Sequence, residues 1–155
     1  EYCLVPSTDR DPLIRYCQII SINTGRNIDV IVPEISSRAS ISAEGSYFFV
    51  GENLISESDL SEIWSLPDGI RSNLGVIGSS CSEDASLIAV TLRNQNSRDT
   101  YFYLYNYEND LILRETVNYG DYVRLSSNGA FAMTGPHDFG EIQFPFRVWQ
   151  IRGDQ

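Results

Sequence analysis

The feature that most constrains this chain is a ten-residue pattern that occurs three times. The copies cover residues 41–50, 81–90 and 125–134, and each places a small polar turn between an apolar residue and an apolar run. The turn serines Ser42, Ser82 and Ser126 follow one another at intervals of 40 and 44 residues. A second phrase, with an aromatic residue near its centre, follows each copy at 62–69, 103–110 and 147–154. A period of this size indicates a repeat architecture in which each unit is one small supersecondary structure.

The units of this repeat read as β-strands. The chain has nine tyrosines and seven phenylalanines, which lie among Ile and Val and favour a pleated, half-buried surface. No segment has a helical period, so we expect no helix, and we read Pro67-Asp68-Gly69 as a turn between two strands. The predicted strands are 2–5, 13–22, 28–32, 38–42, 46–50, 61–66, 71–77, 78–82, 87–92, 100–107, 111–117, 122–126, 130–134 and 145–151.

Short strands that repeat every 40 to 45 residues or so are typical of β-propeller blades. We therefore predict an all-β fold of four-stranded antiparallel blades arranged radially. The repeats divide the 155 residues into a partial blade at 1–33, two blades at about 34–75 and 76–120, and a partial blade at 121–155. About three and a half blades cannot close a ring. We expect the remainder to come from the same gene, a second copy or another subunit, and apolar residues such as Phe144 and Phe146 to lie on the open faces.

The repeats resemble those of the WD-repeat family, over nearly the whole chain. Residues 42–45 and 126–129 resemble the Ser-x-Asp-Gly turn of that family, and Asp99 stands six residues before an aromatic residue, as is typical there. The Gly-His pair that opens such repeats is missing, so the buried His–Ser–Asp–Trp network of the family should be absent or fragmentary. The resemblance implies equivalent, buried positions at the ends of third strands for Trp64, Tyr105 and Trp149.

The charge of the chain narrows the class of partner. The formal net charge is −10 and the sequence pI is about 4.4, so the surface should repel a nucleic-acid backbone. The eleven basic residues are all arginine, and lysine is absent. No apolar run approaches the roughly 18 residues that cross a membrane, and no glycosylation sequon occurs. We expect an intracellular protein with protein partners. Of three cysteines, Cys3 and Cys17 would face each other in a hairpin centred near Arg10, which makes a disulfide geometrically conceivable, but we expect free, buried thiols because cysteine behaves as a small apolar residue.

Few residues suggest chemistry. The lone histidine, His137, stands beside Asp138 in the loop 136–144, but there is no second histidine, and the cysteines lack metal-ligand spacing. The sequence contains no nucleophile elbow, phosphate-binding loop or dinucleotide fingerprint. We predict no catalytic residue, no metal and no cofactor.

The loops between second and third strands form the face that the resembling family commonly uses for partners. They are predicted at 7–12, 52–60, 93–99 and 136–144. Arginine and amide side chains make several directed hydrogen bonds, so we expect the partner to contact Arg93, Asn94, Asn96, Arg98, His137 and Asp138. The leading hypothesis is a non-catalytic protein–protein interaction scaffold that forms the C-terminal part of a larger WD-repeat propeller. The alternatives are a regulatory or gating propeller of a larger enzyme and a self-assembling, carbohydrate-binding repeat protein.

Overall fold

The structure is a computed structural model of the chain. It describes residues 2–7, 15–21, 27–32, 39–42, 45–71, 74–97, 99–117, 122–135 and 146–151, with side chains from Ser40 onward except that of Arg71. Within these residues the chain is built almost entirely of strands, as the sequence predicts.

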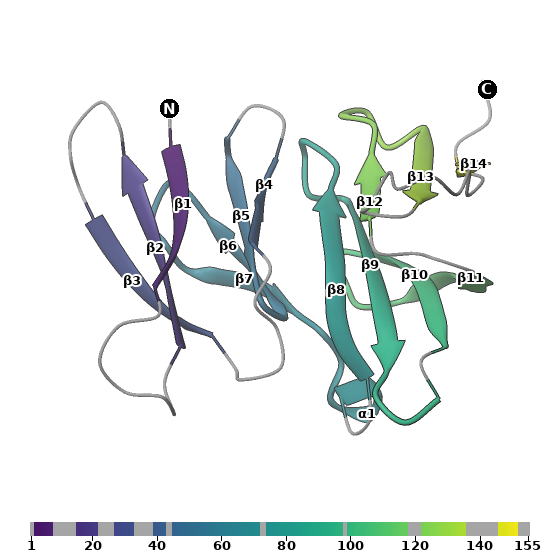
Figure 1. Ribbon diagram of the computed structural model, residues 1–155. Helices are drawn as coiled ribbons and strands as arrows, with labels where there is room; N and C mark the ends of the chain where they lie inside the picture. The colour runs from purple at the N-terminus through teal and green to yellow at the C-terminus, as the bar shows by residue number, and fades with distance from the viewer. Residues whose placement is uncertain are drawn as a thin grey trace.

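The strands form four antiparallel sheets that follow one another in chain order (Figure 1). Sheet I contains β1 (Tyr2–Ser7), β2 (Arg15–Ser21) and β3 (Asn27–Val32). Sheet II contains β4 (Ala39–Ile41), β5 (Tyr47–Val50), β6 (Asn53–Ser56) and β7 (Glu62–Ser65). Sheet III contains β8 (Leu74–Cys81), β9 (Leu87–Asn94), β10 (Thr100–Asn106) and β11 (Leu111–Val117). Sheet IV contains β12 (Tyr122–Leu125), β13 (Phe131–Gly135) and β14 (Arg147–Gln150). In every sheet each strand pairs with the next one in the sequence.

The repeated serines make the same turn in sheets II, III and IV. Each serine hydroxyl accepts a hydrogen bond from the amide five residues later, at 3.1 Å for Ser42, 3.0 Å for Ser82 and 3.0 Å for Ser126. Each serine carbonyl accepts from the amide three residues later. That third residue has a positive φ, which explains why two copies carry glycine there, whereas the copy in sheet III carries Ala85.

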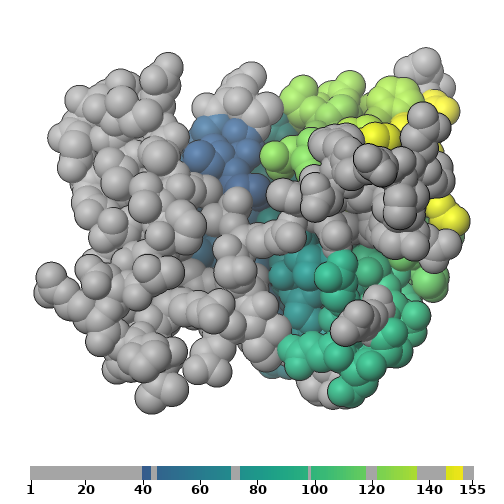
Figure 2. Space-filling model, viewed as in Figure 1, coloured from purple at the N-terminus to yellow at the C-terminus, as the bar shows by residue number. Residues whose placement is uncertain are grey.

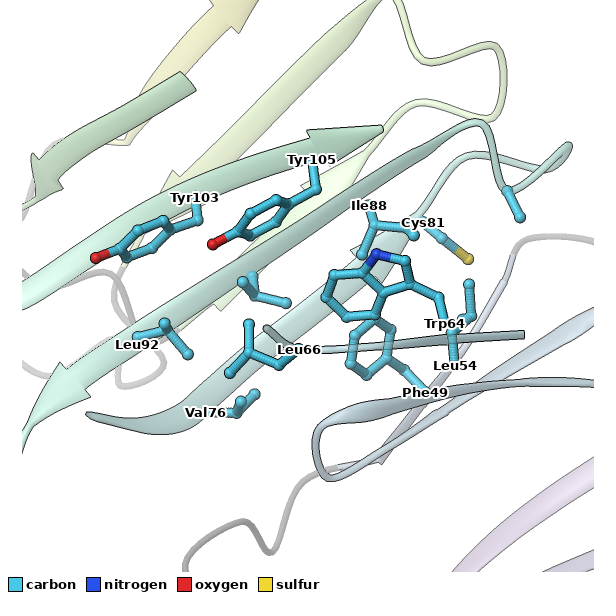
Figure 3. Close-up of a cluster of buried hydrophobic side chains, with 12 residues drawn as sticks. Phe49, Leu54, Trp64, Leu66, Val76, Cys81, Ile88, Leu92, Tyr103 and Tyr105 are labelled. Atoms are coloured by element: carbon cyan, nitrogen blue, oxygen red, sulfur yellow. The ribbon is translucent and has the colours of Figure 1, made fainter. Parts of the chain in front are cut away.

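Sheets II, III and IV pack face to face. One core lies between sheets II and III and contains Phe49, Trp64 and Tyr105 (Figure 3). Alternate residues of β9 point to opposite faces, so that Ile88 joins this core while Leu87 joins a second core shared with sheet IV. Sheet III is therefore covered on both faces, as expected for a blade inside a propeller, and the space-filling view shows sheet IV beside it (Figure 2).

Hydrogen bonds also join the first strands of neighbouring sheets. β4 contacts β8, and β8 contacts β12. The Ser40 hydroxyl donates to the Ser79 carbonyl oxygen at 3.1 Å, and the Ser80 hydroxyl accepts from the Leu125 amide at 3.0 Å. The Glu83 amide donates to the Ser127 carbonyl oxygen at 2.8 Å. These bonds hold the first strands side by side, which gives the sheets their radial arrangement.

One strand of sheet II, β6, was not predicted, and its presence changes the strand on which Trp64 lies. The sequence predicts a loop over 52–60, but β6 (Asn53–Ser56) lies within it and buries Leu54 and Ile55. The prediction failed because a strand with only two apolar residues between polar ones resembles a loop. Trp64 consequently lies on the fourth strand of sheet II, and its predicted place on a third strand is wrong.

The true counterpart of the other two aromatic residues is Ile55. Tyr105 and Trp149 both lie on third strands, opposite the second residue of their second strands. In sheet II, Ile55 takes this place opposite Phe48. Trp64 is instead in the row of Leu54 and faces sheet III from the other side of sheet II. The sequence pattern therefore aligned Trp64 with Tyr105 because both are aromatic, although Trp64 faces the sheet that follows its own and Tyr105 faces the sheet that precedes its own.

The expectation of no helix is also wrong, because the structure contains one helical turn. Helix α1 (Asp68–Arg71) follows Pro67, which fixes φ and accepts a hydrogen bond from the Ile70 amide at 3.0 Å. A single turn is too short to produce a helical period in the sequence. The predicted strands 71–77 and 78–82 accordingly become the end of α1 and one strand, β8, which has a bulge between Val76 and Gly78.

The predicted facing of Cys3 and Cys17 is wrong as well. The register of β1 and β2 pairs Cys3 with Ile20 and Cys17 with Pro6. The two cysteines are thus offset by three residues, about 10 Å along the strand, whereas a disulfide needs Cα atoms within about 7 Å. The hairpin is centred later in the chain than Arg10.

Candidate functional site

The predicted partner-binding loop after β9 is a compact turn. The Asn94 side-chain oxygen accepts hydrogen bonds from the amides of Asn96 at 2.8 Å and Ser97 at 3.2 Å. The Asn94 amide donates to the Asp99 carbonyl oxygen at 2.8 Å, and the Ser97 hydroxyl donates to the Asp99 carboxylate at 2.5 Å. Asn94 and Asp99 therefore shape the loop, and their polar groups are already engaged.

The side chains that this turn presents are Gln95 and Asn96, which are exposed, and Arg93, which is half-buried at the end of β9. Arg98, His137 and Asp138 lie outside the described residues. The structure thus places Arg93 and Asn96 at the same end of sheet III.

None of the other three predicted loops is described in the structure as one complete loop. The loop 136–144 lies outside the described residues, as does 7–12 beyond Ser7. The loop 52–60 is reduced to two short connections around β6. In the second of these, Asp59 accepts hydrogen bonds from the amide and the hydroxyl of Ser61 at 3.0 and 2.8 Å. These bonds lower the pKa of the Asp59 carboxyl, so this carboxylate organises the turn.

Strand β10 carries an aromatic ladder that was not predicted from the sequence. Tyr101, Tyr103 and Tyr105 share one face of the strand, and the exposed guanidinium of Arg114 lies 5.3 Å from the ring centre of Tyr101 and 5.5 Å from that of Tyr103. The signal was present, because tyrosine at every second position predicts one face of a strand. The position of Arg114 depends on the pairing of β10 with β11, which could not be read from spacing.

The buried end of this ladder contains two unusual polar atoms. Tyr105 is 1% exposed and Trp64 is 3% exposed, with ring centres 5.7 Å apart. Neither the Tyr105 hydroxyl nor the Trp64 indole nitrogen has a hydrogen-bond partner among the described residues. Asp99, the acid that the family resemblance associates with the aromatic position, is exposed and bonded to Ser97 instead.

The described residues contain no cluster of three or more metal-ligating side chains. No helix in the described part of the chain has the length and apolar character needed to cross a membrane.

Comparison with solved structures identifies the fold class. The chain is similar to the structure of the Dos1 propeller, with a TM-score of 0.56 and 12% sequence identity, over 97% of this chain and 42% of that one. It also aligns with the Cps50 (Swd1) β-propeller domain of Myceliophteria thermophila at a TM-score of 0.39 and 8% identity, over 92% of this chain and 68% of that one. No family model matches the chain, and no curated protein matches it.

The chain therefore has the fold of a partial, open β-propeller. It spans less than half the length of the Dos1 propeller. At this level of identity the likeness concerns the fold alone.

Proposed function

We propose that this chain is part of a non-catalytic protein–protein interaction scaffold, a propeller of the WD-repeat type. The observation that carries the proposal is the burial of both faces of sheet III between its neighbours. A sheet used in this way leaves its end loops and its outer strand available to a partner. The blade divisions at 34–75 and 76–120 belong to the same proposal.

The proposed contact surface is the rim formed by the loop between β9 and β10. Arg93 supplies a planar cation that can bond a carboxylate in two places, and Asn96 supplies an exposed amide that can pair with a peptide group. Arg98, His137 and Asp138 extend this rim in the proposal. The guanidinium charge at this rim attracts a carboxylate locally, so we expect the bound segment to carry an acidic residue, while the net charge of −10 disfavours a strongly acidic partner.

The proposal includes two kinds of protein partner. One kind binds at this rim, inside the cell. The other kind is the set of sheets that complete the ring, because four sheets in an open row leave apolar side chains at the end of sheet IV exposed.

The test is quantitative affinity capture from the source cells. Wild-type protein is compared with a rim variant that carries Arg93→Gln, Asn96→Ala and Arg98→Gln. The matched control carries Tyr107→Ser and Glu108→Ser in the β10–β11 turn, at the opposite end of β10, and circular dichroism verifies the fold of all three. We expect the same captured proteins for wild type and control, and at least tenfold less for the rim variant. Equal capture by all three proteins would refute the proposal that the rim binds the partner. Catalytic turnover that depends on the rim residues would refute the proposal of a non-catalytic scaffold.

A further inference from the structure

Equivalent positions form both of the interfaces between sheets II, III and IV. Leu54 lies opposite Phe49 in sheet II, and Leu104 lies opposite Ala89 in sheet III. These two leucines are 0% and 1% exposed, because in each case the following sheet covers them. The face that a sheet turns toward its successor therefore has a fixed set of buried positions.

The same positions are exposed in sheet IV. Val148, opposite Met133, is the counterpart of Leu104 and is 64% exposed. Phe131 is the counterpart of Leu87, which is 4% exposed, but Phe131 itself is 49% exposed. This face, defined by Phe131, Met133 and Val148, is thus built like an interface. We call it the successor face of sheet IV.

The first strand of sheet IV departs from this repeat in one residue. Ser40 and Ser80 occupy equivalent places opposite Phe49 and Ala89, and each hydroxyl bonds to the first strand of the following sheet. The counterpart in β12 is Arg124, opposite Met133. Arg124 is exposed; its Nε donates to the Tyr122 hydroxyl at 3.1 Å, and its guanidinium lies 5.1 Å from the tyrosine ring centre.

Arg124 changes what a covering sheet must supply. A serine hydroxyl is satisfied by a backbone carbonyl or amide, as the two existing interfaces show. A guanidinium that becomes covered needs an anionic partner, because a buried charge without one is strongly unfavourable. The bond to Tyr122 supplies no counter-charge.

We propose that the successor face binds a further antiparallel β-sheet of the same polypeptide, which places apolar side chains on Phe131 and Val148 and a carboxylate on Arg124. This rests on the proposed completion of the ring. The occupant is a sheet of the same polypeptide because both interfaces that the structure shows are formed between consecutive sheets of one chain. The carboxylate belongs on its first strand, where Ser79 and Leu125 meet the serines of the earlier interfaces.

The test is photo-crosslinking in the full-length product of the natural gene. Benzoylphenylalanine replaces Val148, or replaces Ile112 as a control, since Ile112 is 49% exposed on β11 of sheet III and outside the successor face. We expect the Val148 probe to crosslink to a strand-forming segment of the same polypeptide outside these 155 residues, and the Ile112 probe to give at least tenfold less of that product. Adding Arg124→Glu should reduce the crosslink at least tenfold, whereas Arg124→Lys should retain at least half of it.

Four outcomes would overturn the proposal: no crosslink at Val148, equal products from both probes, a crosslink to a second copy or an unrelated protein, or no effect of Arg124→Glu. A circular dichroism spectrum of the full-length product with Arg124→Glu, unchanged from wild type, shows that the variant folds. The rim capture experiment is independent of this face, so a failure here and a failure of the scaffold proposal are distinguishable.

Discussion

Replacing Tyr105 by phenylalanine should stabilise this protein, although the same change destabilises most proteins at a buried tyrosine. The Tyr105 hydroxyl lies in the core between sheets II and III with no hydrogen-bond partner among the described residues. Folding removes this hydroxyl from water without replacing the lost hydrogen bonds. Tyr105→Phe removes the unsatisfied group and leaves the ring, which lies 5.7 Å from the Trp64 ring and 6.0 Å from the Tyr103 ring.

The magnitude follows from two opposing terms. A buried polar group without a partner costs about 1–3 kcal/mol. The void left by one oxygen atom is smaller than a methyl group and costs less than about 1 kcal/mol. We therefore expect the free energy of unfolding to rise by about 1 kcal/mol, which corresponds to roughly 2–4 °C in Tm for a chain of this length.

The assay is urea unfolding followed by tryptophan fluorescence, with Tyr101→Phe as the control. Tyr101 lies on the same face of β10 but is half-buried, so its change should stay within about 0.5 kcal/mol. Burial also raises the pKa of Tyr105, so the unfolded state loses this proton first as the pH rises past about 10. The wild type should therefore lose stability above that pH more steeply than Tyr105→Phe. Destabilisation of Tyr105→Phe by 1 kcal/mol or more would show that the hydroxyl is satisfied, and would refute the reasoning.

Three further predictions concern the repeats and the core. Gly129→Ala should destabilise by about 2 kcal/mol in urea unfolding, because φ is +69° and the new Cβ would lie 2.8 Å from Leu87 Cδ1; an unchanged midpoint would contradict this. Trp64→Ala should cost about 3–5 kcal/mol, and Trp149→Ala clearly less because Trp149 is only partly buried; the reverse order would mean that the two packing environments are misassigned. Cys81 should resist alkylation at pH 8, since burial, with Glu83 and Asp84 nearby, raises its pKa to about 12; rapid labelling of the folded protein would contradict this.

The repeat made most of the fold predictable. Ser42, Ser82 and Ser126 mark the same turn in sequence and in structure, because each hydroxyl must bond the same amide to close the hairpin. The sequence could not show which face of a sheet a side chain occupies after a strand that was not predicted. Such a strand changes the strand to which every later residue of the repeat is assigned. β6 has only Leu54 and Ile55 as apolar residues, and missing it moved Trp64 to the wrong strand.

The candidate site was less predictable than the fold. Asn96 lies in the connection between β9 and β10, as predicted, because strong strands flank it, whereas Arg93 belongs to the end of β9 itself. The engagement of Asn94 in the turn was not predicted, because it depends on the path of the backbone through the loop. The successor face of sheet IV depends on pairings across three strands, which no local pattern encodes.

The order of pairing within the sheets has a consequence for synthesis on the ribosome. Because every strand pairs with its neighbour in sequence, each sheet can form by successive hairpins as the chain emerges. Sheet II has all its strands by Ser65, yet Trp64 and Leu54 are covered only when β8–β10 have followed, about 40 residues later. At roughly 5–20 residues per second this interval lasts about 2–8 s. For those seconds the nascent chain presents a large apolar face, which is the kind of surface that a ribosome-associated chaperone binds.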